Sequence, residues 1–269
     1  MSRATKSRTV QTPISPSKTK LLYLNINMVT EDIESVIENM INIFKNNLTR
    51  VAACKDRYLG EVPNNLIIAY MYVHFFKRVF DFLVALCALP FFCIIYIVLA
   101  PFYFIMDRGP MFYSGKRIGQ HGKPFPMHKF RSMKVNAPDI RLKDGSTYNG
   151  DDDPRVTSLG RFLRKTSLDE IPQILNVLKG DMSWIGPRPD PLDWLDVYKG
   201  HDRAILTVKP GITGYNQAYF RNSVDGMEKL KNDVYYADHI SFMFDVKIVL
   251  KTIKTVLFRE NVNISEDRK

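Results

Sequence analysis

The residues of this chain that could most clearly carry out chemistry are two adjacent carboxylates, Asp169 and Glu170. Ser167 precedes Glu170 by three residues, which is the capping-box pattern of a helix N-terminus. Apolar residues recur at helical spacing after the pair, and Pro172 favours an early turn because proline is poorly tolerated later in a helix. The pattern therefore predicts that both carboxylates lie on the first turn of a helix.

Cations surround this predicted helix start. They are Arg161, Arg164, Lys165 and Arg188. The free N–H groups and the positive dipole end of a helix N-terminus attract phosphate. Carboxylates among cations and amides therefore indicate a centre that handles phosphate. An ordinary helix start, in which the two acids only favour the dipole, remains an open alternative on these residues alone.

The wider string is more specific. Residues 167–189 contain Ser-Leu-Asp-Glu-x-Pro-Gln, Asn-Val-Leu-Lys-Gly-Asp-Met-Ser and Gly-Pro-Arg-Pro, in that order. These motifs resemble the bacterial sugar transferases that act as polyprenol-phosphate phosphoglycosyl transferases, a monotopic family that starts cell-envelope glycan assembly. The resemblance covers about residues 77–258, roughly two-thirds of the chain, and implies the small, single-domain type.

The composition indicates polyanionic partners. The formal net charge is +10 and the sequence pI is about 9.4, which suits nucleic acid, anionic lipid or phosphorylated substrates. Nucleic acid is the least favoured of the three, because the chain carries no recognisable nucleic-acid-binding motif. Cys54, Cys87 and Cys93 lack metal-ligand spacing; Cys87 and Cys93 lie in the most apolar stretch, where cysteine is usually buried. A reduced, cytoplasmic setting is expected.

Composition and resemblance together predict five segments. They are a disordered basic tail (1–20), a small N-terminal extension without a recognisable motif (21–65), a membrane-associated helix region (66–108), a catalytic domain (109–260) and a polar tail (261–269). The expected fold is helix-rich α+β, with a membrane-dipping re-entrant helix and a cytoplasmic catalytic domain that carries interfacial amphipathic helices.

The apolar region has two properties that conflict with a simple membrane crossing. From Phe82 to Met106 about 25 residues pass without a charge, enough for a helix to span a bilayer core of roughly 30 Å. Basic residues lie on both flanks, however, and the positive-inside rule places both flanks on the cytoplasmic face. Pro90 would cost about 3 kcal/mol in an unbroken helix. We therefore expect a break at Pro90 and a re-entrant hairpin; a single-pass anchor or a buried helical hairpin is the alternative.

The resemblance implies the same layout. Lys77, Arg78, Asp81 and Pro90 match the family's Lys-Arg-x-x-Asp element and the Ser-Pro break that follows it. Leu89 stands where the family usually has serine, so the hydroxyl that could satisfy a freed backbone carbonyl is missing.

Two further groups of residues match the family between the apolar region and the carboxylate pair. Lys129 and Arg131 are two residues apart, so in a strand they would share one side and face anionic groups together; a solvated basic edge is the alternative. Asp153 and Arg155 match an element that the resemblance implies at the active-site rim. Asp151 and Asp152 precede them, but consecutive carboxylates usually mark a solvated loop, so a metal site there is the less favoured interpretation.

The C-terminal part adds two elements. The run from Lys209 to Gly214 matches the family and reads as a tight Pro-Gly turn, and Arg221 follows it. Residues 238–258 place apolar side chains on one helical face and lysines on another. Such a helix lies on anionic lipid or packs on the core with a solvated basic face, and the pattern does not separate these two.

The resemblance implies a two-step reaction. Asp169 is the expected nucleophile toward a nucleotide diphospho-sugar, with a UDP-sugar as the expected donor, and the phosphosugar then passes to polyprenol phosphate. Glu170 and Asp169 are the expected ligands of Mg²⁺. The expected phosphate- and substrate-binding residues are Arg164, Arg188, Lys129, Arg131, Arg155 and Arg221.

The implied location is the cytoplasmic face of the bacterial inner membrane, with anionic lipid as a partner and downstream glycosyltransferases as further candidates. The alternative function is a non-catalytic, basic membrane-surface scaffold for envelope-assembly enzymes. A scaffold has no need of Asp169, Glu170, Arg164 and Arg188 at these spacings.

Overall fold

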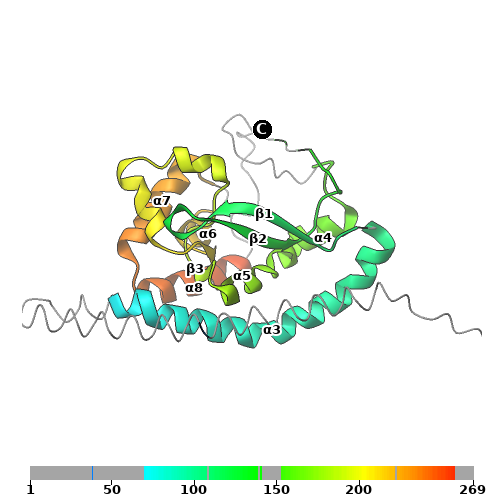
Figure 1. The fold of residues 1–269 in the computed structure, drawn as a ribbon, viewed down its shortest axis with the longest axis horizontal. Coiled ribbons are helices and arrows are strands. Elements are labelled where there is room, and N and C mark those ends of the chain that lie inside the picture. Colours follow the sequence, from blue (N-terminus) through cyan, green and yellow to red (C-terminus); the bar gives the residue numbers. More distant parts are fainter. Residues whose placement is uncertain are drawn as a thin grey trace, which may run out of the picture.

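The computed structural model of the protein describes Glu38 and residues 70–107, 109–138, 140, 153–221 and 223–257 (Figure 1). The predictions for the tail 1–20, for the polar tail 261–269 and, apart from Glu38, for the extension 21–65 lie outside the described residues. Cys54, Asp151 and Asp152 lie outside them too.

The described chain is helix-rich, with two small pairs of strands, which confirms the expected α+β class. The helices are α3 (Lys77–Phe102), α4 (Ser158–Thr166), α5 (Gln173–Lys179), α6 (Tyr215–Tyr219), α7 (Gly226–His239) and α8 (Phe242–Leu257). The strands are β1 (Phe112–Ile118), β2 (Pro124–Phe130), β3 (Ser183–Ile185) and β4 (Gly211–Thr213). Turns of π-helix flank α3 at Tyr72–Phe76 and Tyr103–Asp107, and short 3-10 segments lie at Gln120–Gly122, Leu168–Glu170, Leu192–Asp196 and Gly200–Thr207.

The helix α3 lies along the underside of the molecule as a continuous, curved helix (Figure 1). The predicted break at Pro90 is wrong, because α3 continues through this residue to Phe102. Ala85 before the proline and Phe92 and Leu99 after it are all buried in one core, so packing against the same domain holds both halves in one helix. A proline in such a position bends a helix without ending it when tertiary contacts oppose a break.

The other side of α3 is apolar and exposed. With its flanking turns, Tyr72–Asp107 forms a helix of 36 residues that is long and apolar enough to cross a membrane by length and composition alone. Its exposed large side chains include Phe80, Phe91, Ile94, Ile97 and Phe104. Cys87 and Cys93 are exposed as well, so the expectation that they are buried is wrong. They lie on the side of the helix that faces away from the core.

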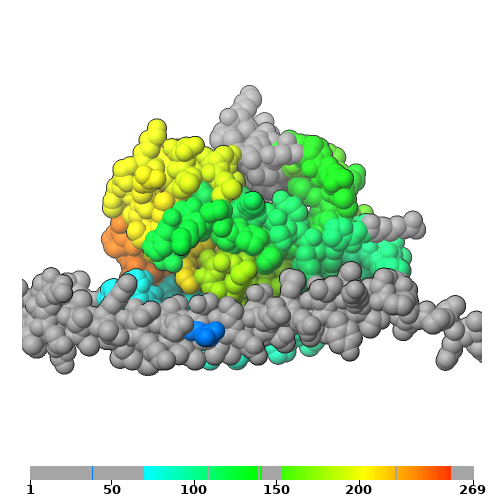
Figure 2. Space-filling model, in the orientation of Figure 1, coloured from blue at the N-terminus to red at the C-terminus, as the bar shows by residue number. Residues whose placement is uncertain are grey.

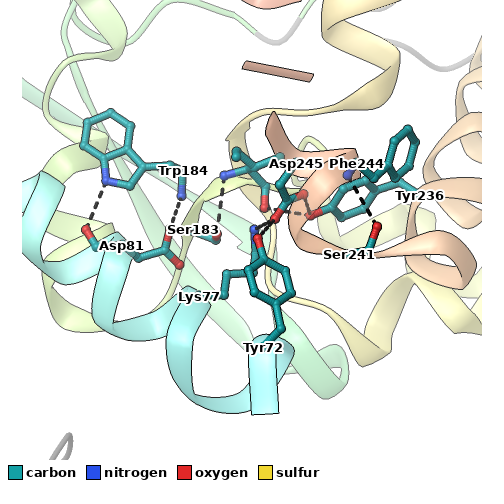
Figure 3. A network of polar contacts seen from close by, with 10 residues as sticks. Tyr72, Lys77, Asp81, Ser183, Trp184, Tyr236, Ser241, Phe244 and Asp245 are labelled. Carbon is teal, nitrogen blue, oxygen red and sulfur yellow. Dashed lines mark hydrogen bonds and ion pairs between the residues drawn. The ribbon is translucent and has the colours of Figure 1, made fainter. Parts of the chain in front are cut away.

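A buried network around Asp245 joins the start of α3 to α8 (Figure 3). Its carboxylate accepts hydrogen bonds from Lys77 Nζ at 2.5 Å, Tyr72 Oη at 2.6 Å and Tyr236 Oη at 2.8 Å. Three donors from three segments therefore satisfy one buried carboxylate, as burial of a charge requires.

Arg78 and Asp81 attach α3 to the elements that follow the carboxylate pair. Arg78 donates to the carbonyl oxygens of Val177 at 2.6 Å and Leu178 at 2.9 Å, which supplies a positive charge to the C-terminal end of α5. The Asp81 carboxylate accepts from Ser183 Oγ and from the Trp184 N–H, both at 3.0 Å (Figure 3). The residues that match the family's Lys-Arg-x-x-Asp element therefore hold the helix on the domain.

The largest core cluster lies between α3, the β1–β2 hairpin and α5. The two strands pair antiparallel, with Phe112 opposite Phe130. The Phe92 ring of α3 stacks with both, at centroid distances of 6.4 and 6.1 Å. On the face shown in Figure 2, the hairpin (green) reaches the surface beside the yellow segment around residues 192–207. The hairpin thus has α3 on one side and carries Lys129 near its end.

The Pro210–Gly211 step begins a strand, so the predicted tight turn is wrong. Gly211 opens β4, which pairs parallel with β3. A Cβ atom on Gly211 would lie 2.1 Å from the backbone nitrogen of Gly186, so the two backbones approach too closely for any side chain. Glycine is therefore needed here for contact between strands, a requirement that local turn signals do not reveal.

The helix predicted over residues 238–258 is observed as α8, which begins later, at Phe242, because Asp238 and His239 end α7. Ile248 is fully buried in a core cluster with Tyr236 and Val208. Met243, Leu250 and Ile253 are exposed. One face of α8 therefore packs on the domain while a separate apolar face does not.

Candidate active site

The carboxylate pair lies on a short 3-10 turn between α4 and α5. The predicted capping box is wrong: Ser167 has φ 58° and ψ 16°, and its side chain makes no capping hydrogen bond. This residue is the C-cap of α4 and has the left-handed conformation that commonly ends a helix. Pro172 is the residue before α5, which begins at Gln173. The carboxylates therefore precede the helix instead of lying on its first turn.

Glu170 has two cationic partners. Its Oε1 accepts from Lys129 Nζ at 2.7 Å and from one amino group of Arg188, whose other amino group donates to Oε2 at 3.2 Å. Burial alone would raise the pKa of Glu170, but the charges and hydrogen bonds of Arg188 and Lys129 outweigh it and hold that pKa well below its usual range. Glu170 in turn raises the pKa of Arg188. Burial lowers the pKa of Lys129, and the charge of Glu170 opposes that effect.

Asp169 has no such partner. Its residue is only 8% exposed, and within the described part of the chain its carboxylate makes no hydrogen bond or ion pair. Burial raises the pKa of this carboxyl; the nearby charge of Lys129 opposes the rise and that of Glu170 adds to it. A buried carboxylate with unused oxygens is available for bond formation or for a cation.

Arg164 approaches the pair from α4. Its Nε donates to Ser132 Oγ at 2.9 Å. Burial lowers the pKa of its guanidinium, and the charge of Asp169 opposes that effect. The helix can come this close because residue 160 is glycine: a Cβ there would lie 1.9 Å from the Ser132 carbonyl oxygen. The neighbouring cations of the predicted cluster, Arg161 and Lys165, are exposed.

The other predicted substrate-binding residues have different surroundings. Arg131 does not lie on the same strand as Lys129, as the spacing predicted: it follows the end of β2, and its guanidinium donates to the carbonyl oxygens of Pro110 at 2.7 Å and Met133 at 3.1 Å. Arg155 forms a buried pair with Asp153, with its Nη2 donating to Oδ2 at 2.7 Å.

Arg221 lies in the turn after α6 with φ 49°, and its backbone N–H donates to the Asn216 carbonyl oxygen at 2.9 Å. The roles of Arg155 and Arg221 in substrate binding stay predictions.

Asn176 positions the site without having been singled out from the sequence. Its Oδ1 accepts from the His128 N–H at 2.9 Å, and its Nδ2 donates to the Pro126 carbonyl oxygen at 2.7 Å. These bonds fix β2 against α5 and so bring Lys129 to Glu170. The signal was present, because Asn176 begins one of the family motifs, but a motif does not say which side chain connects two elements.

No group of three or more His, Cys, Asp or Glu residues with the geometry to hold a metal occurs among the described residues. Of the acidic run only Asp153 is described, and it is paired with Arg155. Asp169 and Glu170 still fit an ion such as Mg²⁺, which usually binds one or two carboxylates and completes its shell with water and substrate phosphates. The free oxygens of Asp169 are suitable hard ligands, whereas Glu170 already binds two cations.

Comparison with known proteins gives the family. The bacterial sugar transferase family model matches residues 72–259. An undecaprenyl-phosphate galactose phosphotransferase of Salmonella typhimurium is 39% identical over 219 residues, 75% of this chain and 44% of that protein. A UDP-N-acetylgalactosamine-undecaprenyl-phosphate N-acetylgalactosaminephosphotransferase of Aeromonas hydrophila is 38% identical over 192 residues, 68% of this chain and 44% of that protein.

A shorter relative, the uncharacterized sugar transferase EpsL of Bacillus subtilis, is 40% identical over 186 residues, 69% of this chain and 89% of that protein. The chain thus spans less than half of the two longer relatives and most of EpsL. The match of the family model over most of the chain, including α3, the carboxylate pair and α8, shows that this chain belongs to the bacterial sugar transferase family.

Proposed function

We propose that this chain transfers a phosphosugar from a nucleotide diphospho-sugar, most plainly a UDP-sugar, to polyprenol phosphate and so initiates the assembly of a cell-envelope glycan. The observation that carries this proposal is the Asp169 carboxylate, which is buried, has no partner among the described residues and lies among Lys129, Arg164 and Arg188. The names of the Salmonella and Aeromonas relatives support the lipid acceptor, and the Aeromonas name supports the UDP-sugar donor.

In the first half-reaction an oxygen of Asp169 attacks the phosphorus next to the sugar. The bond from that phosphorus to the oxygen bridging the two phosphates breaks, and a nucleoside monophosphate leaves. In the second, an oxygen of polyprenol phosphate attacks the same phosphorus. The bond to Asp169 breaks, which restores the carboxylate and yields polyprenol diphospho-sugar.

The cations of the site perform the electrostatic part of this chemistry. Phosphoryl transfer depends mainly on positioning and on neutralising charge around phosphorus. Arg164 and Arg188 come from two different segments, and the charges of both act on Asp169. Guanidinium groups are well suited to binding phosphate oxygens. Glu170 holds Lys129 and Arg188 beside Asp169.

Mg²⁺, when bound by Asp169, Glu170 and substrate oxygens, would supply further charge neutralisation of the diphosphate.

We place the chain at the cytoplasmic face, and the way α3 is held supports a monotopic position. Lys77 at its start pairs with Asp245, and Tyr103 after its end donates to the Arg131 carbonyl oxygen at 2.5 Å. A helix held by one domain at both ends does not place its ends on opposite sides of a bilayer. The exposed apolar sides of α3 and α8 would then lie in the lipid, where the acceptor is.

The test is nucleoside monophosphate release from a panel of UDP-sugars, with Mg²⁺ and a polyprenol phosphate, by the intact protein and by Asp169→Asn. Release that needs the lipid for turnover and is lost in Asp169→Asn supports the proposal and identifies the donor. Absence of release with every sugar, while the protein still binds anionic vesicles, contradicts it and favours the scaffold.

A further inference from the structure

A second group of charges lies near Arg188 and joins two residues of α7 to the segment that follows Arg188. Lys229 Nζ lies 2.9 Å from both oxygens of Asp190 and 2.9 Å from Oδ2 of Asp233. Tyr198 Oη donates to the Asp190 carboxylate at 2.8 Å. Lys229 also donates to the backbone carbonyl oxygen of Arg188 at 3.4 Å. One ammonium group therefore connects two buried carboxylates to the segment that carries Arg188.

The backbone around Arg188 is held in place, so only rotation of its side chain can change where the guanidinium points. Pro187 and Pro189 restrict the backbone on either side. The Pro187 carbonyl oxygen accepts from the Gly211 N–H at 2.8 Å, and the Asp190 carbonyl oxygen accepts from the Ile118 N–H at 3.0 Å. The guanidinium can still rotate about its own side-chain bonds.

The Arg188 guanidinium contacts Glu170, and Asp190 lies two residues away along the chain. Glu170 is the main cause of the raised pKa of Arg188, and Asp190 contributes in the same direction, so the Asp190 charge acts on Arg188. Lys229 and Tyr198 occupy the Asp190 carboxylate. Without Lys229, Asp190 would be a buried carboxylate short of a cation, two residues from Arg188.

We infer that Lys229 is a positioning residue that, by holding Asp190, keeps the Arg188 guanidinium directed at Glu170 and the substrate phosphates. This inference rests on the proposed function. Lys229 and Asp233 form an i,i+4 pair on α7, an arrangement that is usually a solvated surface feature. Their burial and the contact with the Arg188 segment give the pair a different role.

Asp190 and Asp233 make a matched comparison. Both are buried and both pair with Lys229, but only Asp190 lies in the Arg188 segment. In Lys229→Met each is left without its cation, so a second substitution of either one, Asp190→Asn or Asp233→Asn, should relieve the same kind of buried charge. Both double variants should therefore recover thermal stability lost in Lys229→Met.

The kcat values of the two double variants should differ. We expect Lys229→Met to lower kcat about tenfold or more, and Lys229→Met with Asp190→Asn to recover most of that loss. Lys229→Met with Asp233→Asn should stay slow, because Asp190 still attracts Arg188. Equal recovery by both double variants, recovery by neither, or wild-type kcat in Lys229→Met would overturn the inference.

Binding of UDP with Mg²⁺, measured by calorimetry on the same four proteins, separates this inference from the proposed function. If the wild-type protein releases no nucleoside monophosphate from any sugar, the proposed function fails. The order of UDP affinities still tests Lys229: we expect about tenfold weaker binding in Lys229→Met, restored by Asp190→Asn and not by Asp233→Asn. Equal affinities in all four proteins would contradict the positioning role.

Discussion

Two buried carboxylates of this chain have opposite surroundings. Asp245 is 2% exposed and accepts from Lys77, Tyr72 and Tyr236 (Figure 3). Asp169 is 8% exposed and accepts from no group within the described residues, although three cations lie near it. The first carboxylate joins α3 to α8, and the second has its oxygens unused.

The difference indicates that Asp245 stabilises the fold, whereas Asp169 is available for chemistry. A buried charge with all its partners contributes to a unique packing, and breaking it is costly. A buried charge without direct partners destabilises the fold unless another process, such as substrate binding, uses it. The contrast between Asp245 and Asp169 therefore predicts that their substitutions affect different measurements.

The largest effect is expected for Asp169→Asn. Turnover should fall at least about 10³-fold, because an amide is not a competent nucleophile toward phosphorus. The free energy of unfolding should rise by about 1 kcal/mol, because a buried unpaired charge is removed. Nucleoside monophosphate release measures the turnover, and denaturant unfolding in detergent measures the free energy of unfolding. A less stable Asp169→Asn protein would contradict the assigned environment.

Glu170→Gln should lower turnover by about 10²- to 10³-fold, because Lys129 and Arg188 lose the charge that holds them beside Asp169. Unlike Asp169→Asn, it should also destabilise the fold, since two cations lose their partner. The same two assays apply. If Glu170→Gln raised stability, the two adjacent carboxylates would not differ as described.

Asp245→Asn should lower the free energy of unfolding by about 3 kcal/mol, because Lys77 is left buried without its charge partner. The turnover of the molecules that remain folded should stay within about twofold of wild type, because Asp245 does not contact the carboxylate pair. Turnover measured well below the melting temperature tests this. A loss of turnover as large as that of Glu170→Gln would mean that the network and the site are coupled.

The smallest effect is the pH dependence of these stability differences. The pKa of Glu170 is depressed in the fold, so its stabilisation is present above the unfolded value of about 4.3 and is lost as the pH falls further. The pKa of Asp169 is raised, so the advantage of Asp169→Asn over wild type should shrink as the pH falls through that raised pKa and vanish below about 3.9. Denaturant unfolding curves measured from about pH 8 down to about pH 3.5 give the free energies of unfolding of the variants for this comparison. If the stability advantage of Asp169→Asn over wild type grew as the pH fell, the raised pKa of Asp169 would be contradicted.

Several features were predictable from the sequence because they depend on neighbours along the chain. The periodicity of α8 and the family motifs around Asp169 and Glu170 are of this kind. Helix-breaking and turn signals failed at Pro90 and Gly211, because packing of α3 on the core and close contact of two strands outweigh local preference.

The sequence by itself determined the family, the helix-rich α+β class and the presence of two carboxylates among cations. Only the tertiary structure decided which cation meets which carboxylate. Lys129 reaches Glu170 from 41 residues away, whereas Arg131, two residues later, binds backbone carbonyl oxygens. Composition and spacing do not contain such choices, because hydrogen bonds and buried charges depend on distances that exist only once β2, α4 and α5 have packed together.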